Sequence, residues 1–103
     1  MLRDNLRRYT GTESHEVRIA YDVLGAAYAR EALPPQKRNF TERSDGRVEL
    51  VLRLNNLVDI EKEVLRAGEH AEALAPIALR RRVRDVLRAA LKQYEDLEDH
   101  GAE

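Results

Sequence analysis

Residues 47–54 constrain the fold of this chain more than any other segment, because apolar and polar side chains alternate along them. Neighbouring side chains of an extended strand point to opposite faces, so a period of two predicts a strand with one buried face. Asp45 and Gly46 supply a tight hairpin turn just before it, and residues 36–43 are the candidate for the first strand of that hairpin. The predicted buried face consists of Val48, Leu50, Leu52 and Leu54.

A similar alternation near the start of the chain predicts another strand, over residues 15–22, with Val17, Ile19 and Tyr21 on its buried side. The carboxylate of Asp22 can accept hydrogen bonds from the free backbone N–H groups of a helix that begins there. We predict this helix over residues 23–33, and Pro34-Pro35 ends it. Its predicted apolar stripe consists of Leu24, Ala27, Tyr28 and Ala32.

Two helices and a short strand are predicted for the rest of the chain. Asn56 is a predicted N-cap, and the helix after it ends at Gly68, because glycine adopts the left-handed conformation of a C′ residue most easily. Residues 71–75 form a short predicted strand, and Pro76 suits the first turn of a last helix that reaches about Leu97. The apolar stripe of the earlier helix consists of Leu57, Ile60, Val64 and Leu65.

The predicted order is strand, helix, strand, strand, helix, strand and an added helix. We therefore expect an α+β fold, a ferredoxin-like β-α-β-β-α-β antiparallel sheet with an added C-terminal helix. The right-handed crossover rule places both inner helices on one face of the sheet and leaves the other face open. We expect residues 1–14 to be a linker or docked arm from a missing upstream domain, residues 15–98 to be the domain, and residues 99–103 to be an acidic tail.

Several function classes are excluded by composition and motif content. With 103 residues the chain is long enough for one domain, and without cysteine it has no disulfide, thiol nucleophile or Cys-ligated metal. Its apolar runs are too short to span a bilayer, so we expect no membrane and a cytoplasmic location. It contains no nucleophile elbow, HExxH pair or glycine-rich phosphate loop, so we expect no enzyme activity, no metal and no cofactor.

Charge is sorted along the chain even though its sum, 18 Lys+Arg against 19 Asp+Glu, is only −1. This sum argues against a general nucleic-acid coat, but the basic residues concentrate in the last helix and the acids follow it. Two interpretations stay open: the arginines form an anion-binding surface, or they are a solvated helix face. The basic run is Arg80, Arg81, Arg82, Arg84, Arg88 and Lys92 against Asp85, and the acids after it are Glu95, Asp96, Glu98, Asp99 and Glu103.

The open sheet face is a second predicted location for basic side chains. Alternation places Arg18 and Arg53 there, next to Ala20 and Val51, and arginine beside modest apolar surface can contact phosphates and stack on bases. Phe40 is the aromatic residue with a chance of facing outward on a predicted strand. With so few aromatic side chains on which bases could stack, we do not expect this domain to bind single-stranded nucleic acid on its own.

The last helix also carries a narrow apolar seam that alternates steps of four and three. Such a seam is suited to packing along one edge of the domain or against a partner helix. Its residues are Val83, Leu87, Ala90 and Tyr94, with Leu97 beyond them.

These patterns together resemble the C-terminal extension, called WCX, of WYL-domain transcriptional regulators. The resemblance covers about Leu2 to Tyr94 and rests on turns and apolar positions. It is carried by residues 15–21 (HEVRIAY), Pro34-Pro35-Gln36, the hairpin strand 45–54, the helix that ends at Gly68, residues 72–76 (EALAP) and the last helix.

The resemblance implies that this chain works together with domains that its sequence does not contain. Relatives carry an upstream winged helix-turn-helix and a WYL core, and neither is found in this sequence, so we expect a cloned fragment or a truncated reading frame. The implied role is regulatory: a homodimerisation module that contributes basic residues to an anionic effector site, with single-stranded nucleic acid as one candidate. The candidate effector-binding residues are Arg18, Arg38 and Arg53 from the sheet and Arg80, Arg81 and Arg84 from the last helix.

A purely structural module remains the alternative interpretation. In it, the seam pairs two copies of the chain and the arginines are only solvated. Retention on a phosphate-bearing matrix that weakens with salt is expected only if the basic groups converge.

Overall fold

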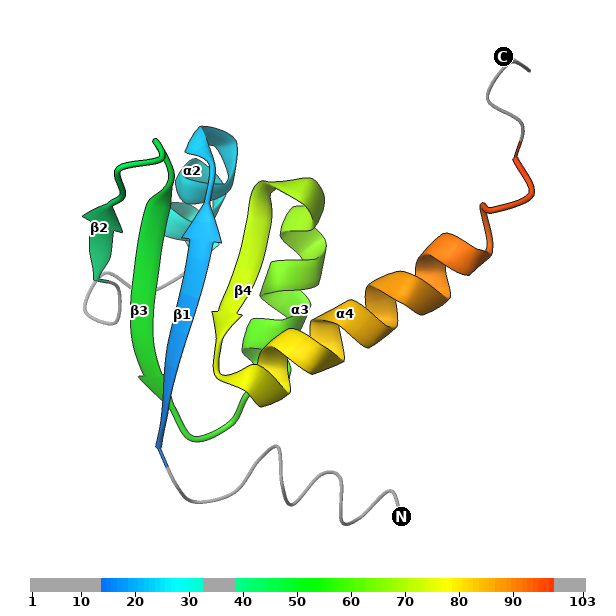
Figure 1. The fold of residues 1–103 in the computed structure, drawn as a ribbon. Coiled ribbons are helices and arrows are strands. Elements are labelled where there is room, and N and C mark those ends of the chain that lie inside the picture. Colours follow the sequence, from blue (N-terminus) through cyan, green and yellow to red (C-terminus); the bar gives the residue numbers. More distant parts are fainter. Residues whose placement is uncertain (1–13, 33–38, 98–103) are drawn as a thin grey trace.

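The computed structural model describes residues 14–32 and 39–97. Within these ranges the chain is a mixed α+β structure with a four-stranded antiparallel sheet, in the strand order β2-β3-β1-β4, and three α-helices (Figure 1). The elements are β1 (His15–Tyr21), α2 (Val23–Ala32), β2 (Phe40–Glu42), β3 (Val48–Leu54), α3 (Val58–Ala67), the short 3-10 helix η2 (Gly68–His70), β4 (Ala71–Ala75) and α4 (Ile77–Lys92). Each predicted strand and helix therefore has a counterpart in the structure.

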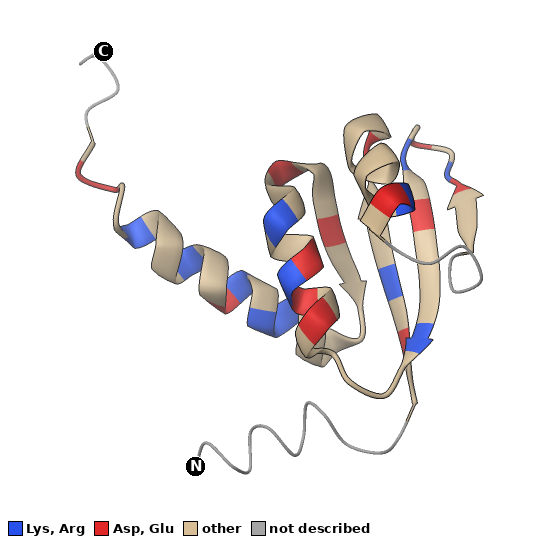
Figure 2. Cartoon of the chain, turned by 180° about the vertical axis from the view of Figure 1, so that it is seen from behind, with Lys and Arg blue, Asp and Glu red and all other residues tan. Residues whose placement is uncertain are grey.

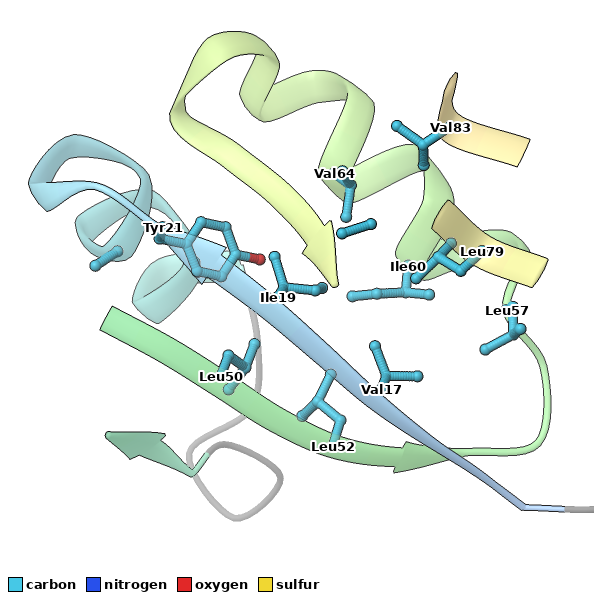
Figure 3. Close-up of a cluster of buried hydrophobic side chains, with 13 residues drawn as sticks. Val17, Ile19, Tyr21, Leu50, Leu52, Leu57, Ile60, Val64, Leu79 and Val83 are labelled. Carbon is cyan, nitrogen blue, oxygen red and sulfur yellow. The ribbon is translucent and has the colours of Figure 1, made fainter. Parts of the chain in front are cut away.

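The long central strands β1 and β3 define two different faces of the sheet. Val17 pairs with Leu52 and Ile19 with Leu50, and these four side chains are buried on the face that α2 and α3 cover (Figures 1 and 3). The next residues along the strands point the other way, so Arg18 lies beside Val51 on the open face. The two predicted alternations thus share one register, and both inner helices lie on the same side.

The core fills the space between the sheet, α3 and the first turns of α4 (Figure 3). Leu57, Ile60 and Val64 from α3 and its approach meet Leu79 and Val83 from α4, and none of these is more than 7% exposed. Tyr21 lies at the other end of the core, where burial raises the pKa of its hydroxyl to about 12. The predicted stripe of the second helix, which includes Leu57, Ile60 and Val64, is confirmed.

The apolar stripe predicted for α2 is wrong. Leu24 is 66% exposed, and the helix instead buries small residues, Gly25, Ala26 and Ala29. The reason is close approach: a Cβ on Gly25 would collide with the carbonyl oxygen of His70 and lie 2.9 Å from the Tyr21 ring. Ala27 and Ala32 are also exposed, and half-buried Tyr28 accepts a hydrogen bond from Arg66 instead of filling the core.

The helix ends and the turn follow the sequence signals, with two exceptions. The Asp22 carboxylate accepts a hydrogen bond of 2.8 Å from the Gly25 N–H, and Gly46 and Gly68 have φ values of 88° and 61°, which glycine adopts without steric cost. The first exception is α3: the Asn56 side chain accepts a hydrogen bond of 2.8 Å from Val58, but the N-cap residue is Leu57, one position after the predicted one. The second is the last helix, which ends at Lys92 and continues as turns instead of reaching Leu97.

The predicted first strand of the hairpin is shorter than expected. Of residues 36–43, only Phe40–Glu42 form a strand, while Pro34, Pro35 and Arg38 lie outside the described residues. Phe40 pairs with Leu50, packs against the core and has Arg30 4.7 Å from its ring centre. It therefore faces the helices, and its predicted outward orientation is wrong. No helix in the described part of the chain has the length and apolar character needed to cross a bilayer.

Candidate functional site

Two surfaces hold the arginines that the sequence singled out: the open sheet face and a groove beside α4. Arg18 and Arg53 lie on the open face, and Arg80 begins the basic run of α4 next to β4. Arg38 lies outside the described residues. The structure therefore does not gather the predicted residues into one site, and each surface has to be considered separately.

On the open face, arginines alternate with carboxylates in a continuous ion-pair network. Arg18 lies 2.7 Å from both Glu16 and Glu49, and the hydrogen bonds that it donates to Glu49 and then to Glu16 raise its pKa. At the other end, Glu72 accepts from Arg47 at 2.7 Å and from Arg80 at 2.8 Å, and these bonds lower its pKa. In order of contact the network runs Arg53, Glu16, Arg18, Glu49, Arg43, Asp45, Arg47, Glu72, Arg80.

This network limits the open face as an anion site. An incoming phosphate has to displace a carboxylate from Arg18 before that guanidinium can bind it, so part of the attraction is lost. The network also covers the sheet: Ala20, whose register partners are Glu49 and Glu72, is only 1% exposed on this face. Exposed ion pairs contribute little to stability, so their main effect here is to neutralise the arginines.

The second surface is a groove of about 450 Å³ between β4 and α4. Its apolar lining comes mainly from Ile77, Leu87 and Leu91, each at least half exposed. The groove brings together three predicted effector residues and two residues of the predicted seam. Its full lining is Ala71, Glu72, Ala73, Ile77, Arg80, Arg81, Val83, Arg84, Leu87, Arg88 and Leu91.

The groove has a larger cationic excess than the open face, with four arginines and one carboxylate in its lining. Arg80 donates to Glu72 and to the carbonyl of Ala73, both at 2.8 Å, and Arg84 pairs with Asp85. Within residues 14–32 and 39–97, neither Arg81 nor Arg88 makes an ion pair. Figure 2 shows basic segments, in blue, spread along α4, which extends away from the sheet.

The predicted seam is divided between the core and the solvent. Val83 is 7% exposed and packs in the core, whereas Leu87, Ala90 and Tyr94 are exposed where α4 leaves the sheet. The seam thus packs against its own domain at one end and is free at the other.

Sequence reasoning missed six groove residues: Ala71, Glu72 and Ala73 on β4, and Ile77, Arg88 and Leu91 on α4. Arg88 was noticed in the basic run but not assigned to a site. Ile77, Arg84, Arg88 and Leu91 recur at steps of seven, four and three, so a search for a second helical face could have found them.

A second groove, of about 580 Å³, lies between the end of α2 and α3. Leu52, Leu54 and Ile60 line its floor, and its polar rim has both charge signs, including Lys62 and Glu63. None of the predicted site residues lines it, and its mixed charge does not favour an anion.

A polar link outside both grooves joins the start of α2 to η2. His70 Nδ1 lies 2.7 Å from Asp22 Oδ2, and the Asp22 N–H donates to the His70 carbonyl at 3.2 Å. The hydrogen bond between the side chains raises the pKa of His70 and lowers that of Asp22. The charged pair therefore stabilises the contact between these two segments.

This link predicts how stability varies with pH. His70 has a folded pKa above the ordinary 6.5, so its contribution is complete below that pH and is lost as pH rises through the folded value. Asp22 has a folded pKa below the ordinary 3.8, so its contribution is lost as pH falls through that lower value. We expect the free energy of unfolding to decline above pH 6.5, and His70→Gln to remove that decline in urea titrations. His15→Gln is the matched control, and an unchanged decline in His70→Gln would contradict the assignment.

Comparison with known proteins adds one finding to this geometry. The chain matches the family model of the WCX domain over residues 13–91, which include all strands and helices described above except the last residue of α4. A search of curated proteins finds no match. The matched span includes the open-face network and the groove.

Proposed function

The chain belongs to the WCX domain family, and on that premise we propose that it is the C-terminal regulatory and dimerisation module of a WYL-type DNA-binding transcriptional regulator. In this proposal it contributes basic residues to an anionic effector site and is not an enzyme. Its partners are an upstream WYL core, a winged helix-turn-helix domain and a second copy of itself, and it acts in the cytoplasm. The element order and the strand order β2-β3-β1-β4 support assigning it to the ferredoxin-like class.

One observation supports the effector role above the others: the cationic excess of the groove beside α4. Arg81 and Arg88 flank exposed apolar side chains and have no carboxylate partner among the described residues. A guanidinium offers a planar fork of donors to a phosphate, and nearby apolar surface can accept the face of a base. These features favour an anion that also has a flat apolar part, such as a single-stranded oligonucleotide.

The proposal predicts that the two surfaces differ in binding. In a fluorescence-anisotropy titration with a short labelled oligothymidylate, we expect affinity to fall with rising salt, because phosphate contacts release counterions. Arg81→Ala should weaken binding roughly two- to fivefold and reduce the salt slope by about 0.7, the value for one phosphate contact of a single strand. Arg18→Ala, whose guanidinium is already paired with two carboxylates, should change affinity less than Arg81→Ala.

The two variants also serve as controls for each other, because both remove one exposed arginine. Equal losses in both variants would assign the effector to a surface that includes the open face. Absence of binding at high micromolar protein would argue against an effector site on this chain.

The purely structural alternative is also supported by a specific observation. Leu87, Leu91 and Tyr94 are 50%, 59% and 66% exposed, an apolar surface that a partner helix can cover. A dimer in sedimentation velocity together with no oligonucleotide binding would favour this alternative.

A further inference from the structure

The projecting part of α4 and the turns that follow it have opposite charges. From Arg80 to Lys92 the only acid is Asp85, and the next charged side chains, Glu95 and Asp96, are both acidic and exposed. Figure 2 shows this change of sign at the end of the helix. One face of the molecule therefore has a cationic part and an anionic part arranged along a single axis.

Exposed apolar side chains follow the same axis. Leu87, Leu91, Tyr94 and Leu97 are 50% to 71% exposed, although Val83 and Leu79, one and two turns before Leu87, are buried against α3 and the sheet. A row of large apolar residues that leaves the domain body is an unusual feature of a monomer surface and marks a protein contact. A partner for this row has to supply apolar surface and both charge signs.

We propose that a second copy of this chain docks on α4 in an antiparallel arrangement, so that Glu95 and Asp96 of the partner subunit lie close to Arg84, with Arg81 one turn further along the helix. This inference rests on the dimerisation part of the proposed function and specifies its surface and its orientation. The two-fold axis passes close to Ala90, which is small enough to let the helices approach each other.

Charge excludes the opposite orientation. A parallel pair would place the two basic runs side by side and the two acidic ends together, and facing like charges oppose association at an interface. In an antiparallel pair, the acidic end of each subunit lies against the basic run of the other. The contact therefore occurs twice, as expected for a self-complementary surface with a two-fold axis. The apolar row also matches: Tyr94 of each copy falls level with Leu87 of the other.

The arginines that meet the acidic end are suitable for this contact. Arg81 has no ion pair among the described residues, and the partner of Arg84 is Asp85, its neighbour in sequence. Neither arginine belongs to the open-face network, so docking does not disturb that network.

Charge reversal tests the contact by sedimentation velocity. We expect Arg81→Glu/Arg84→Glu and Glu95→Arg/Asp96→Arg each to raise the dimer dissociation constant about tenfold or more. Combining all four substitutions should return it to near the wild-type value, because the opposite charges then face each other again. Arg82→Glu, on the side of α4 that contacts Glu61, is the matched control for a changed net charge.

Cross-linking tests the orientation, and the absence of cysteine from the chain makes single-cysteine variants clean probes. Ala90→Cys should form a disulfide with the same position of the second subunit. The Leu87→Cys and Tyr94→Cys variants should cross-link to each other when they are mixed, but neither should cross-link to a second copy of itself. In the antiparallel pair, the same position on the two subunits is separated by about 10 Å along the helix axis, which is beyond disulfide reach. Self-cross-linking at all three positions would overturn the antiparallel arrangement.

The outcomes separate this inference from the proposed function. A wild-type dimer that is insensitive to both charge reversals overturns the α4 contact while dimerisation itself stands. A wild-type monomer with an intact circular-dichroism spectrum overturns both the contact and dimerisation, and the oligonucleotide titration still reports separately on the effector role.

Discussion

Replacing Leu50 with alanine is expected to lower the free energy of unfolding by about 2–5 kcal/mol. Leu50 is completely buried in the middle of β3, between Ile19 of β1 and Phe40 of β2. Its position at the centre of the sheet leaves little room for neighbours to move in, so truncation leaves a cavity as well as losing apolar burial. Thermal and urea unfolding monitored by circular dichroism would measure the loss.

Two controls belong with this substitution. Val51→Ala removes an apolar side chain from the adjacent position on the partly covered open face, and we expect it to cost less than Leu50→Ala. Arg81→Ala, on the exposed side of α4, should stay within about half a kcal/mol of the wild type. A larger loss for Val51→Ala than for Leu50→Ala would mean that the register of β1 and β3 is wrong.

The elements of the fold could be predicted because their signals are local. Alternation in residues 47–54 and 15–21 identified both central strands, and Asp22, Asn56 and Gly68 marked helix ends through contacts within a few residues. These interactions form within a segment, so the sequence of that segment is enough to recognise them.

The buried face of α2 could not be predicted in the same way. The large residues Leu24 and Tyr28 suggested an ordinary apolar stripe, but the space over β1 admits only small side chains. That limit is imposed by the His70 carbonyl, which lies 45 positions away from Gly25 in the sequence and is brought close only by the fold. A tertiary constraint of this kind leaves no periodic signal.

The candidate site was predicted in part, for a related reason. The basic run of α4 is visible in the sequence, and its exposure is confirmed for Arg80, Arg81 and Arg84. Arg18 was also predicted to lie on the open face, but its two carboxylate partners depend on register: Glu49 is 31 residues away and lies beside it only because β1 pairs with β3. The sequence therefore shows which arginines are present, but only the folded sheet determines which of them are neutralised by a carboxylate.

Helix propensity and the packing of α2 predict opposite changes in stability for Gly25→Ala. In an exposed helix interior, alanine is more favourable than glycine by about 0.8–1.0 kcal/mol, so helix propensity alone predicts that Gly25→Ala stabilises the protein. The structure predicts the opposite. The added methyl group would collide with the His70 backbone, and because a backbone atom cannot rotate away as a side chain can, α2 has to shift. We expect a net loss of about 1–3 kcal/mol, the usual cost of overpacking.

A shift of α2 would also disturb the polar link, because the Asp22 N–H donates to the same His70 carbonyl and the Asp22 side chain caps the helix at Gly25. Gly25→Ala should therefore weaken the pH dependence that His70 imparts above pH 6.5, as well as lowering stability. Ala27→Gly is the matched control: Ala27 is exposed on the same helix, so the change should cost only the helix propensity, about 1 kcal/mol, and leave the pH dependence intact. Urea titrations of both variants between pH 5 and 8 would measure the two effects, and a stabilised Gly25→Ala protein would show that α2 does not pack this closely on η2.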